Sequence, residues 1–212
     1  MKSKLILICL AGVVIAGVCV WSVQAKSNNS IMTETQKKDA VIGTIMERRS
    51  IRAYQAQPVE RDKMETIVEC GLNAPNALNR QPWEVRVADN QEWLKELSEK
   101  AQGKERMQGQ RNMFRNAPTV VFIAAKTDGY MGGVFDCALL CENMVLAAQS
   151  MGIGSCIQGG PVSFFETEAA APYLEKLGFS DGYKLIMTVG FGYADEAPDA
   201  KPRDTSKARF VD

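Results

Sequence analysis

The chain has 212 residues, with 25 Lys and Arg residues, 25 Asp and Glu residues and no histidine. The missing histidine excludes Ser-His and Cys-His nucleophile pairs, histidine general bases and histidine metal ligands. The balanced charge argues against a surface that binds nucleic acid by bulk electrostatic attraction, and the 46% hydrophobic content is that of a globular protein. Any catalysis must therefore depend on a cofactor, on carboxylates, on Cys or Lys, or on backbone groups.

The first 25 residues have the pattern of an export signal. Two lysines precede an uncharged apolar run over residues 5–23, and Val23-Gln24-Ala25 resembles a cleavage site. The same run is long enough to span a bilayer if it is retained as an anchor. We therefore expect an exported protein, periplasmic or otherwise extracytoplasmic, with residues 1–25 as signal peptide or membrane anchor and 26–33 as a polar spacer. Any membrane contact is expected through this N-terminal segment alone.

Hydrophobic periodicity over residues 34–212 predicts five helices and four strands in alternation. In chain order, the predicted elements are a helix over 33–49 capped by Thr33 or Thr35, a helix over 58–72, a strand over 83–88, a helix over 91–102, a strand over 118–125, a helix over 133–151, a strand over 152–158, a helix over 166–177 and a strand over 183–190. Residues 103–117 are predicted to be a mobile segment with a short helix. The pattern indicates one α/β or α+β domain spanning 34–212.

Two of these segments are predominantly apolar. The strand over 118–125 is predicted to be fully buried. The helix over 133–151 carries only Asp136 and Glu142 as charges, so it must be covered on most sides, either centrally or by a partner subunit.

Four cysteines follow the predicted leader: Cys70, Cys137, Cys141 and Cys156. An exported protein can form disulfides, but these residues have apolar neighbours and a domain of this size needs no covalent staples. Cys137 and Cys141 lie one helical turn apart, as in half of a metal site, but no histidine and no second cysteine pair completes it. We therefore predict four buried thiols and no metal.

The glycine-rich segments do not form a standard nucleotide motif. Residues 152–159 lack the third glycine of a dinucleotide fingerprint and the Gly-Lys-Ser/Thr end of a P-loop. Gly190-Phe-Gly192 follows a strand without leading into a helix. Glycines at turns account for both segments.

Arg48-Arg49-Ser50-Ile51-Arg52 stands where the first helix should end and an extended stretch begins. Ser50 and Arg52 point the same way along an extended chain, so a hydroxyl and guanidinium groups can converge on a phosphate. The alternative is that these basic residues neutralise the C-terminus of the helix.

The loop over residues 75–83 is dense in amides, which both donate and accept hydrogen bonds and so suit the edge of a flat heteroaromatic ring. The alternative is a surface turn that leads into a strand beginning at Pro82-Trp83.

Together these motifs resemble the FMN-dependent nitroreductase family, over about residues 38–205. The motifs, in the order of that family, are Arg-Arg-Ser-x-Arg at 48–52, Ala-Pro-x-x-x-Asn-x-Gln-Pro-Trp at 74–83, an apolar helix with Asp136 and Asn143, Gly-Ile-Gly-Ser at 152–155, a glycine-bearing stretch at 157–161, Val-Gly-Phe-Gly-Tyr at 189–193 and Lys201-Pro202-Arg203. The resemblance implies a three-layer α/β/α fold of the α+β class with a mostly antiparallel sheet. It also implies an interlocked homodimer with FMN in clefts between the subunits and the helix over 133–151 at the dimer centre.

By position, the resemblance implies FMN contacts from Arg48, Arg49, Ser50, Arg52, Asn76, Asn79, Gln81, Gln158, Gly159, Gly160, Lys201 and Arg203. The basic residues and Ser50 would hold the phosphate and ribityl end. Asn79 would approach the ring from the partner subunit, and residues 158–160 would lie near the reactive N5 atom.

The implied activity is that of an oxidoreductase in which NAD(P)H reduces FMN at N5 and a nitroaromatic, quinone or similar small acceptor then reoxidises it. This ping-pong scheme needs no catalytic side chain, so a chain without histidine can perform it. One alternative is a flavin-binding or flavin-sequestering module without NAD(P)H turnover, and another is a flavin-destroying or dehalogenating branch of the same superfamily.

The chain departs from the family pattern in four ways. Asn76-Ala77 replaces a pair of serines that many members carry, and the basic side chain often found beside the flavin N1/O2 edge has only Arg80 and Arg111 as candidates. The domain is short, so we expect an open site with residues 103–116 as a variable lid. Export is a further departure, because NAD(P)H is a cytoplasmic reductant and an exported enzyme would need a donor outside.

Overall fold

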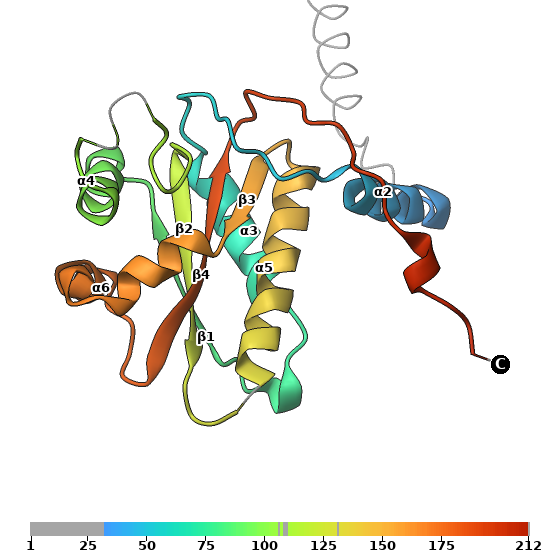
Figure 1. Cartoon of the computed structure of the whole chain (residues 1–212). Coiled ribbons are helices and arrows are strands. Elements are labelled where there is room, and N and C mark those ends of the chain that lie inside the picture. Colours follow the sequence, from blue (N-terminus) through green and yellow to red (C-terminus); the bar gives the residue numbers. More distant parts are fainter. Residues whose placement is uncertain (1–31, 106, 108–109, 131, 212) are drawn as a thin grey trace, which may run out of the picture. The chain divides into compact units, whose positions relative to one another are not determined.

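A computed structural model of the chain describes residues 32–105, 107, 110–130 and 132–211 (Figure 1). The predicted leader and residues 26–31 of the spacer lie outside the described residues. Within the described ranges, no helix combines the length and apolar character that crossing a membrane requires. The chain divides into two compact units, residues 1–42 and 43–212.

The described residues form an α+β fold built on four strands. The helices are α2 (Glu34–Glu47), α3 (Arg61–Leu72), α4 (Gln91–Gln102), α5 (Gly132–Ser150) and α6 (Ala171–Leu177), and the strands are β1 (Trp83–Ala88), β2 (Thr119–Lys126), β3 (Gly154–Gln158) and β4 (Tyr183–Gly192). Short 3₁₀ helices cover Ala77–Asn79, Gly160–Glu166, Glu168–Ala170 and Thr205–Lys207. The strand order is β1-β2-β4-β3, and every neighbouring pair is antiparallel.

Helix α2 begins with a reciprocal cap. The Thr33 hydroxyl accepts a hydrogen bond from the backbone N–H of Gln36 at 3.2 Å, and the Gln36 amide oxygen accepts one from the backbone N–H of Thr33 at 2.9 Å. The cap satisfies helix-end donors and identifies Thr33, rather than Thr35, as the capping residue. No residue of α2 is buried.

Strand β2 shows why the fold has three layers. Successive side chains of a strand point to opposite faces, and all but the last residue of β2 are buried. Val121 and Ile123 belong to the apolar core shared with α3 and α5, whereas Val120 and Phe122 belong to the core shared with α4 and α6. In Figure 1 these helix pairs lie on opposite sides of the sheet. The predominantly apolar sequence of this strand therefore reflects two covered faces, as predicted.

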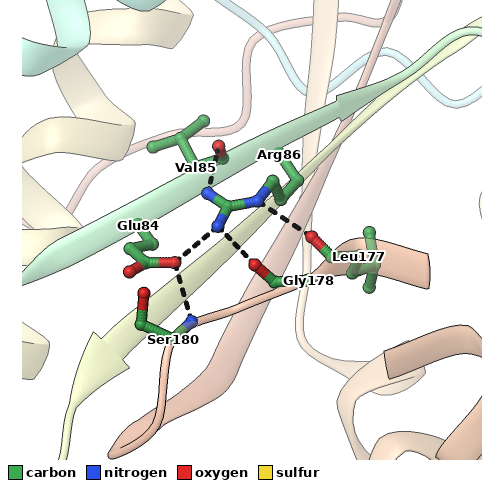
Figure 2. Close-up of polar contacts among 6 residues, drawn as sticks. All are labelled: Glu84, Val85, Arg86, Leu177, Gly178 and Ser180. Carbon is green, nitrogen blue, oxygen red and sulfur yellow. Dashed lines mark hydrogen bonds and ion pairs between the residues drawn. The ribbon is translucent and has the colours of Figure 1, made fainter. Parts of the chain in front are cut away.

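Strand β1 and the end of α6 are joined by Arg86 (Figure 2). Its guanidinium donates to the carbonyl oxygens of Leu177 at 2.8 Å and Gly178 at 2.7 Å, and it pairs with Glu84 at 2.6 Å. Glu84 also accepts a hydrogen bond from the backbone N–H of Ser180 at 3.1 Å. The positive charge thus meets carbonyls that end the helix, where cations are favourable.

Several predicted boundaries were wrong for local reasons. The helix predicted over 166–177 is an α-helix only over 171–177 and is preceded by 3₁₀ turns. Pro172 explains the late start, since proline lacks an N–H and is tolerated only in the first turn. Helix α3 begins at Arg61 rather than at Pro58, and α2 ends at Glu47 rather than at Arg49. The short helix expected between residues 103 and 117 is absent from the described part of that segment.

The cysteines differ from the prediction at one position. Cys137, Cys141 and Cys156 are buried, but Cys70 is exposed. The buried stripe of α3 runs through Met64, Ile67 and Gly71, which leaves Cys70 at its edge. Within the described residues, no three cysteine, aspartate or glutamate side chains gather to hold a metal ion.

The exposed and buried thiols should differ in reactivity. Burial, with a smaller contribution from Asp136, raises the pKa of Cys137 to about 12, and burial likewise raises that of Cys141 to about 12. At pH 8 only about one part in ten thousand of a thiol with that pKa is thiolate, which is the reactive form. We expect iodoacetamide to label Cys70 at least about tenfold faster than Cys137 or Cys141, as read peptide by peptide by mass spectrometry. Equal labelling rates in the native protein, with denatured protein as the control, would contradict the burial of these thiols.

Candidate functional site: a cationic cavity at the end of strand β3

A cavity of about 590 Å³ lies beside the end of β3. Three parts of the chain line it: Arg52; the end of α4 together with residues 111–113 and Arg115; and residues 156–161 with Ser163 and Phe164. Of the predicted FMN-binding residues, the cavity walls include Arg52, Gln158, Gly159 and Gly160. The other eight predicted residues lie elsewhere in the chain.

The segment that carries Arg52 is fixed to β3 and to the end of β4. Ser50 forms a parallel bridge with Ser155, and the backbone N–H of Ile51 donates to the Ser155 carbonyl at 2.9 Å. Ile51 is buried against Gly154, where an added Cβ would lie 2.9 Å from Ile51 Cγ1. Glycine is therefore required at position 154 so that the two segments can approach closely.

Two of the predicted phosphate-binding arginines have different environments. Arg49 donates from Nη1 to the carbonyl oxygens of Met46 and Arg48, both at 2.8 Å, so it caps the C-terminal end of α2. This contact is the alternative role that the sequence allowed for the basic residues. Arg48 is half-buried, and its charge opposes the rise in the pKa values of Cys141 and Cys156 that burial causes. Arg48 therefore lies within electrostatic reach of both thiols, but it is not among the residues that line the cavity.

Arg52 is held by three backbone contacts. Its Nη1 donates to the Ser50 carbonyl at 3.2 Å, and its backbone N–H donates to the Glu196 carboxylate. Its carbonyl oxygen accepts a hydrogen bond from Arg111 Nη1 at 2.5 Å. Arg52 thus brings a guanidinium to the cavity wall on an anchored backbone.

The Gln158 side chain is buried at 7% exposure, and neither its oxygen nor its nitrogen has a hydrogen-bond partner within the described part of the chain. Its backbone is fixed, because the Thr188 hydroxyl donates to the Gln158 carbonyl at 3.1 Å. An unpartnered buried amide costs about 1–3 kcal/mol. A polar group of this kind in a cavity wall indicates that a ligand supplies its hydrogen bonds.

Gly159 and Gly160 follow directly and leave the cavity wall open. An added Cβ at either position would meet no atom within 4 Å. Packing therefore does not require these glycines, whereas any side chain there would project into open space beside the cavity. The wall is shaped so that another molecule can approach the backbone.

Two further groups, Cys156 in the cavity lining and Tyr54 beside Gln158, stay protonated near neutral pH. Burial raises the pKa of Tyr54, whose hydroxyl donates to the Gly190 carbonyl at 3.3 Å beside the Gln158 amide. Burial also raises the pKa of Cys156, although the charges of Arg52 and Arg115 oppose this effect. Neither group is thus a ready proton acceptor.

The amide loop lies outside the cavity lining. Its backbone is left-handed at Leu78, Asn79 and Gln81, with φ of 54°, 53° and 47°. The Asn76 side chain accepts a hydrogen bond from the Gln81 backbone N–H at 2.9 Å, and the Asn79 side chain accepts one from the Gln81 amide at 3.2 Å. The three predicted residues thus hold one another in a strained turn.

The C-terminal predicted residues also lie apart. Lys201 and Arg203 are exposed, and within the described part of the chain neither has a hydrogen bond or ion pair. Their convergence with Arg48 and Arg52 on one phosphate stays a prediction. Arg80 lies over the Tyr130 ring at 4.8 Å, whereas Arg111 lines the cavity, so the structure places one of the two candidate basic residues there.

Sequence reasoning missed several lining residues from the segment after α4 and from the turn after β3. They are Gln102, Asn112, Met113, Arg115, Cys156 and Phe164. One sequence signal could have located the turn that carries several of them. Asn112 and Asn116 stand four residues apart before a buried strand, and such asparagines favour a turn held by side-chain hydrogen bonds.

Comparison with known proteins matches residues 45–193 to the model of the Nitroreductase family. The chain belongs to the nitroreductase family. It is 31% identical over 159 residues to a candidate NADH dehydrogenase/NAD(P)H nitroreductase of Archaeoglobus fulgidus, covering 73% of this chain and 86% of the relative. It is 29% identical to the NADPH-flavin oxidoreductase of Vibrio harveyi, covering 76% of this chain and 69% of that protein.

Solved nitroreductases share the fold. The crystal structure of a nitroreductase with bound FMN from Bacteroides fragilis is similar with a TM-score of 0.74 and 28% identity, over 81% of this chain and 98% of that one. A nitroreductase with bound FMN from Desulfitobacterium hafniense gives a TM-score of 0.73 and 26% identity, over 82% and 98%. The predicted three-layer α+β fold is confirmed.

Proposed function

We propose that this nitroreductase-family chain is an FMN-dependent oxidoreductase that takes reducing equivalents from NADH or NADPH. The proposed acceptor is a nitroaromatic, a quinone or a similar small molecule, reduced in a ping-pong scheme. The observation that carries the proposal is the unpartnered Gln158 amide in a cavity wall. Relatives named as flavin oxidoreductases and family structures with bound FMN support it.

The cavity suits FMN in size and in polar groups. Its volume of about 590 Å³ lies within the range of about 300–1,000 Å³ found for small-molecule sites. The Gln158 amide can both donate to and accept from the edge of a flavin ring. Gly159 and Gly160 add no side chains that would obstruct the ring. Arg52, with Arg48 and Ser50 on the same segment, supplies charge and a hydroxyl for the ribityl and phosphate end.

The cavity walls themselves offer no general base. No Asp or Glu lines the cavity within the described ranges, and the chain has no histidine. Tyr54 and Cys156 are held protonated by burial. FMN, when bound, supplies the redox chemistry. The residues of this chain therefore bind and orient the reactants, and Ile157 and Phe164 give the cavity apolar surface that excludes water.

We also propose that two copies of the chain form a homodimer. One face of α5 is apolar and exposed: Val134 is 52% exposed, Phe135 70% and Leu139 45%. A further apolar side chain, Leu78, is 88% exposed on the strained amide loop. An exposed apolar face of this kind is typical of an interface between subunits. In such a dimer, Asn79 of the same loop can reach the cavity of the other subunit.

The dimer predicts a specific sensitivity at Phe135. Phe135→Asp should weaken self-association by about tenfold or more, because a charge would be buried in an apolar interface. Analytical ultracentrifugation over a range of protein concentrations measures this effect. Glu92→Gln, an exposed change on α4 and therefore on the other side of the sheet, is the control. A wild-type protein that sediments as a monomer at all concentrations would contradict the dimer.

The predicted export of the chain also stays a proposal. Mass spectrometry of the N-terminus after expression distinguishes cleavage after Ala25 from retention of the apolar run, and fractionation locates the product. Recovery of an intact N-terminus in the soluble cytoplasmic fraction would contradict both forms of the proposal.

The visible absorption spectrum of the purified full-length protein tests the proposed function most directly. We expect a yellow protein whose flavin absorbance is bleached by NADH or NADPH and returns on addition of a nitroaromatic or a quinone. A protein that remains colourless after FMN is added contradicts the cofactor. A bound flavin that neither donor bleaches contradicts the enzyme and favours a sequestering module.

A further inference from the structure

The cavity has a second cationic wall beyond the predicted cofactor contacts. Arg52, Arg111 and Arg115 all line it, and no carboxylate does so within the described residues. None of these three arginines takes part in an ion pair in the described part of the chain. Arg52 belongs to the predicted FMN set. Arg111 is otherwise a candidate only for the flavin N1/O2 edge, and Arg115 has no role assigned from the sequence.

Both guanidinium groups retain free donors. Arg111 uses Nη1 to donate to the Arg52 carbonyl at 2.5 Å, and a guanidinium has five N–H donors. The Arg115 side chain has no hydrogen bond within the described residues. Its charge acts on Tyr54 and on Cys156, which places it at the β3 side of the cavity. Glu196, whose charge also acts on Tyr54 and Cys156, is engaged by the backbone N–H of Arg52.

The turn between the two arginines is held in place by asparagines. The Asn112 side-chain oxygen accepts hydrogen bonds from the backbone N–H groups of Phe114 at 3.0 Å and Asn116 at 2.8 Å. The Asn116 side chain accepts one from the Asn112 backbone N–H at 2.9 Å. Phe114 is fully buried, with its ring 5.7 Å from that of Phe122. The turn is thus fixed to the core, and its arginines are carried on a rigid support.

The backbone of Arg115 adopts a conformation that is energetically unfavourable for a residue other than glycine. Its φ is 62°, and that of Asn116 is 58°, both in the left-handed region. A non-glycine residue there costs about 1–3 kcal/mol, which the surrounding contacts must offset. The hydrogen bonds of Asn112 and the burial of Phe114 therefore impose the position of Arg115 at the cavity.

An apolar surface lines the same cavity. Met113 lies between the two arginines in the sequence, and Phe164 lies on the turn after β3. The Phe164 ring is held edge-on by Phe165 at 5.5 Å and by Tyr173 at 6.0 Å. The Gln102 side-chain oxygen is buried there without a hydrogen-bond partner in the described residues. This part of the cavity therefore combines two cations, an amide and an apolar wall.

We propose that Arg111 and Arg115 bind the anionic group, a carboxylate or a phosphate, of a flat substrate that lies against Met113 and Phe164. The inference rests on the proposed function and narrows its substrate class. The anionic group has two possible sources, namely the carboxylate of an acceptor or the phosphates of the nicotinamide donor. The two arginines can bind either group, because guanidinium groups bind carboxylate and phosphate oxygens in the same forked geometry.

Matched charged and neutral substrates test the proposal on the full-length protein. The acceptors are 4-nitrobenzoate and 4-nitrobenzamide, and the donors are NADH and the uncharged 1-benzyl-1,4-dihydronicotinamide. Arg111→Gln and Arg115→Gln should each lower the preference for the charged member of a pair by about fivefold to tenfold. Arg115→Lys should retain part of the preference. Arg61→Gln, an exposed arginine paired with Asp89 and outside the cavity, is the control.

Comparing the acceptor pair with the donor pair shows which molecule supplies the anionic group. A loss of preference in the acceptor pair assigns a carboxylate, and a loss in the donor pair assigns the donor phosphates. Unchanged preference in both pairs overturns the proposal. Weaker FMN retention in both variants with unchanged preference also overturns it, because the arginines would then belong to the cofactor site.

A binding measurement separates this proposal from the proposed function. Calorimetric titration of the same variants with benzoate and with benzamide needs no turnover. If the protein binds no flavin and reduces no substrate, the proposed function is contradicted. The titration still shows whether Arg111 and Arg115 bind an anion. Benzoate that binds no better than benzamide to the wild-type protein then overturns the anion site.

Discussion

Truncating Phe122 to alanine is expected to lower the free energy of unfolding by about 3–5 kcal/mol. Phe122 is fully buried at the centre of β2, on the face covered by α4 and α6. Its ring lies edge-on to Trp93 at 5.9 Å, Phe114 at 5.7 Å and Phe165 at 5.8 Å. Deleting the ring leaves a cavity that three rigid aromatic neighbours cannot fill, so the loss should fall in the upper part of that range.

Denaturant unfolding at a fixed concentration of FMN measures this loss, because a ligand bound only by the folded state would otherwise shift the apparent stability. Phe210→Ala is the matched control, since Phe210 is 99% exposed, and it should change the free energy of unfolding by less than about 0.5 kcal/mol. A loss below about 1 kcal/mol for Phe122→Ala would contradict the burial of this ring.

The same ring connects stability to the site. Phe114 packs against Phe122 and belongs to the turn that carries Arg111 and Arg115. A cavity at position 122 should therefore loosen that turn as well as the core. Phe122→Leu, which retains more of the volume, should lose less stability and keep more of the charged-substrate preference.

The sequence predicted the parts of the fold that have strong periodic patterns. Strand β1 and helix α4 have the predicted bounds, and the buried side chains of α4 include Trp93, Leu94 and Leu97. Strand β2 was predicted as buried because its sequence is a nearly continuous apolar run. In each case the local pattern and the tertiary environment favour the same structure.

The errors arose where a single residue or a distant contact decides the outcome. Pro172 delays the start of α6, although the apolar pattern extends further back. Cys70 has apolar neighbours in the sequence, but it lies one residue before Gly71 of the buried stripe of α3. That difference in position around the helix leaves its side chain exposed. Arg49 was grouped with a phosphate site on spacing. In the structure it donates to the carbonyls at the end of its own helix, and its contact with a phosphate stays a prediction.

Only part of the site could be predicted from the sequence, for a related reason. Arg52 and Gln158 occur in recognisable motifs, and both line the cavity. Arg115 stands in a segment without periodicity, and its position depends on hydrogen bonds between Asn112 and Asn116 and on an aromatic contact with β2. Such contacts join residues by side-chain geometry rather than by pattern, so spacing alone cannot place Arg115.

Replacing Gln158 by methionine should raise stability and weaken cofactor binding in the same protein. The buried amide has no hydrogen-bond partner, so the FMN-free protein bears the cost of desolvating it. Methionine has a similar length and no amide, and Gln158→Met should therefore raise the free energy of unfolding of the FMN-free protein by about 1–2 kcal/mol. The same change removes hydrogen bonds that a flavin would complete, so FMN should bind about tenfold more weakly or worse.

Opposite signs for the two effects distinguish a ligand-binding residue from a packing residue. A side chain that merely fills the core would lose stability on substitution, and its effect on binding would follow that loss. Denaturant unfolding without FMN and fluorescence titration with FMN give the two numbers, with Gln57→Met as the control at an exposed glutamine. A less stable FMN-free variant would mean that the Gln158 amide is already satisfied within the protein, and unchanged FMN affinity would mean that the flavin does not meet it.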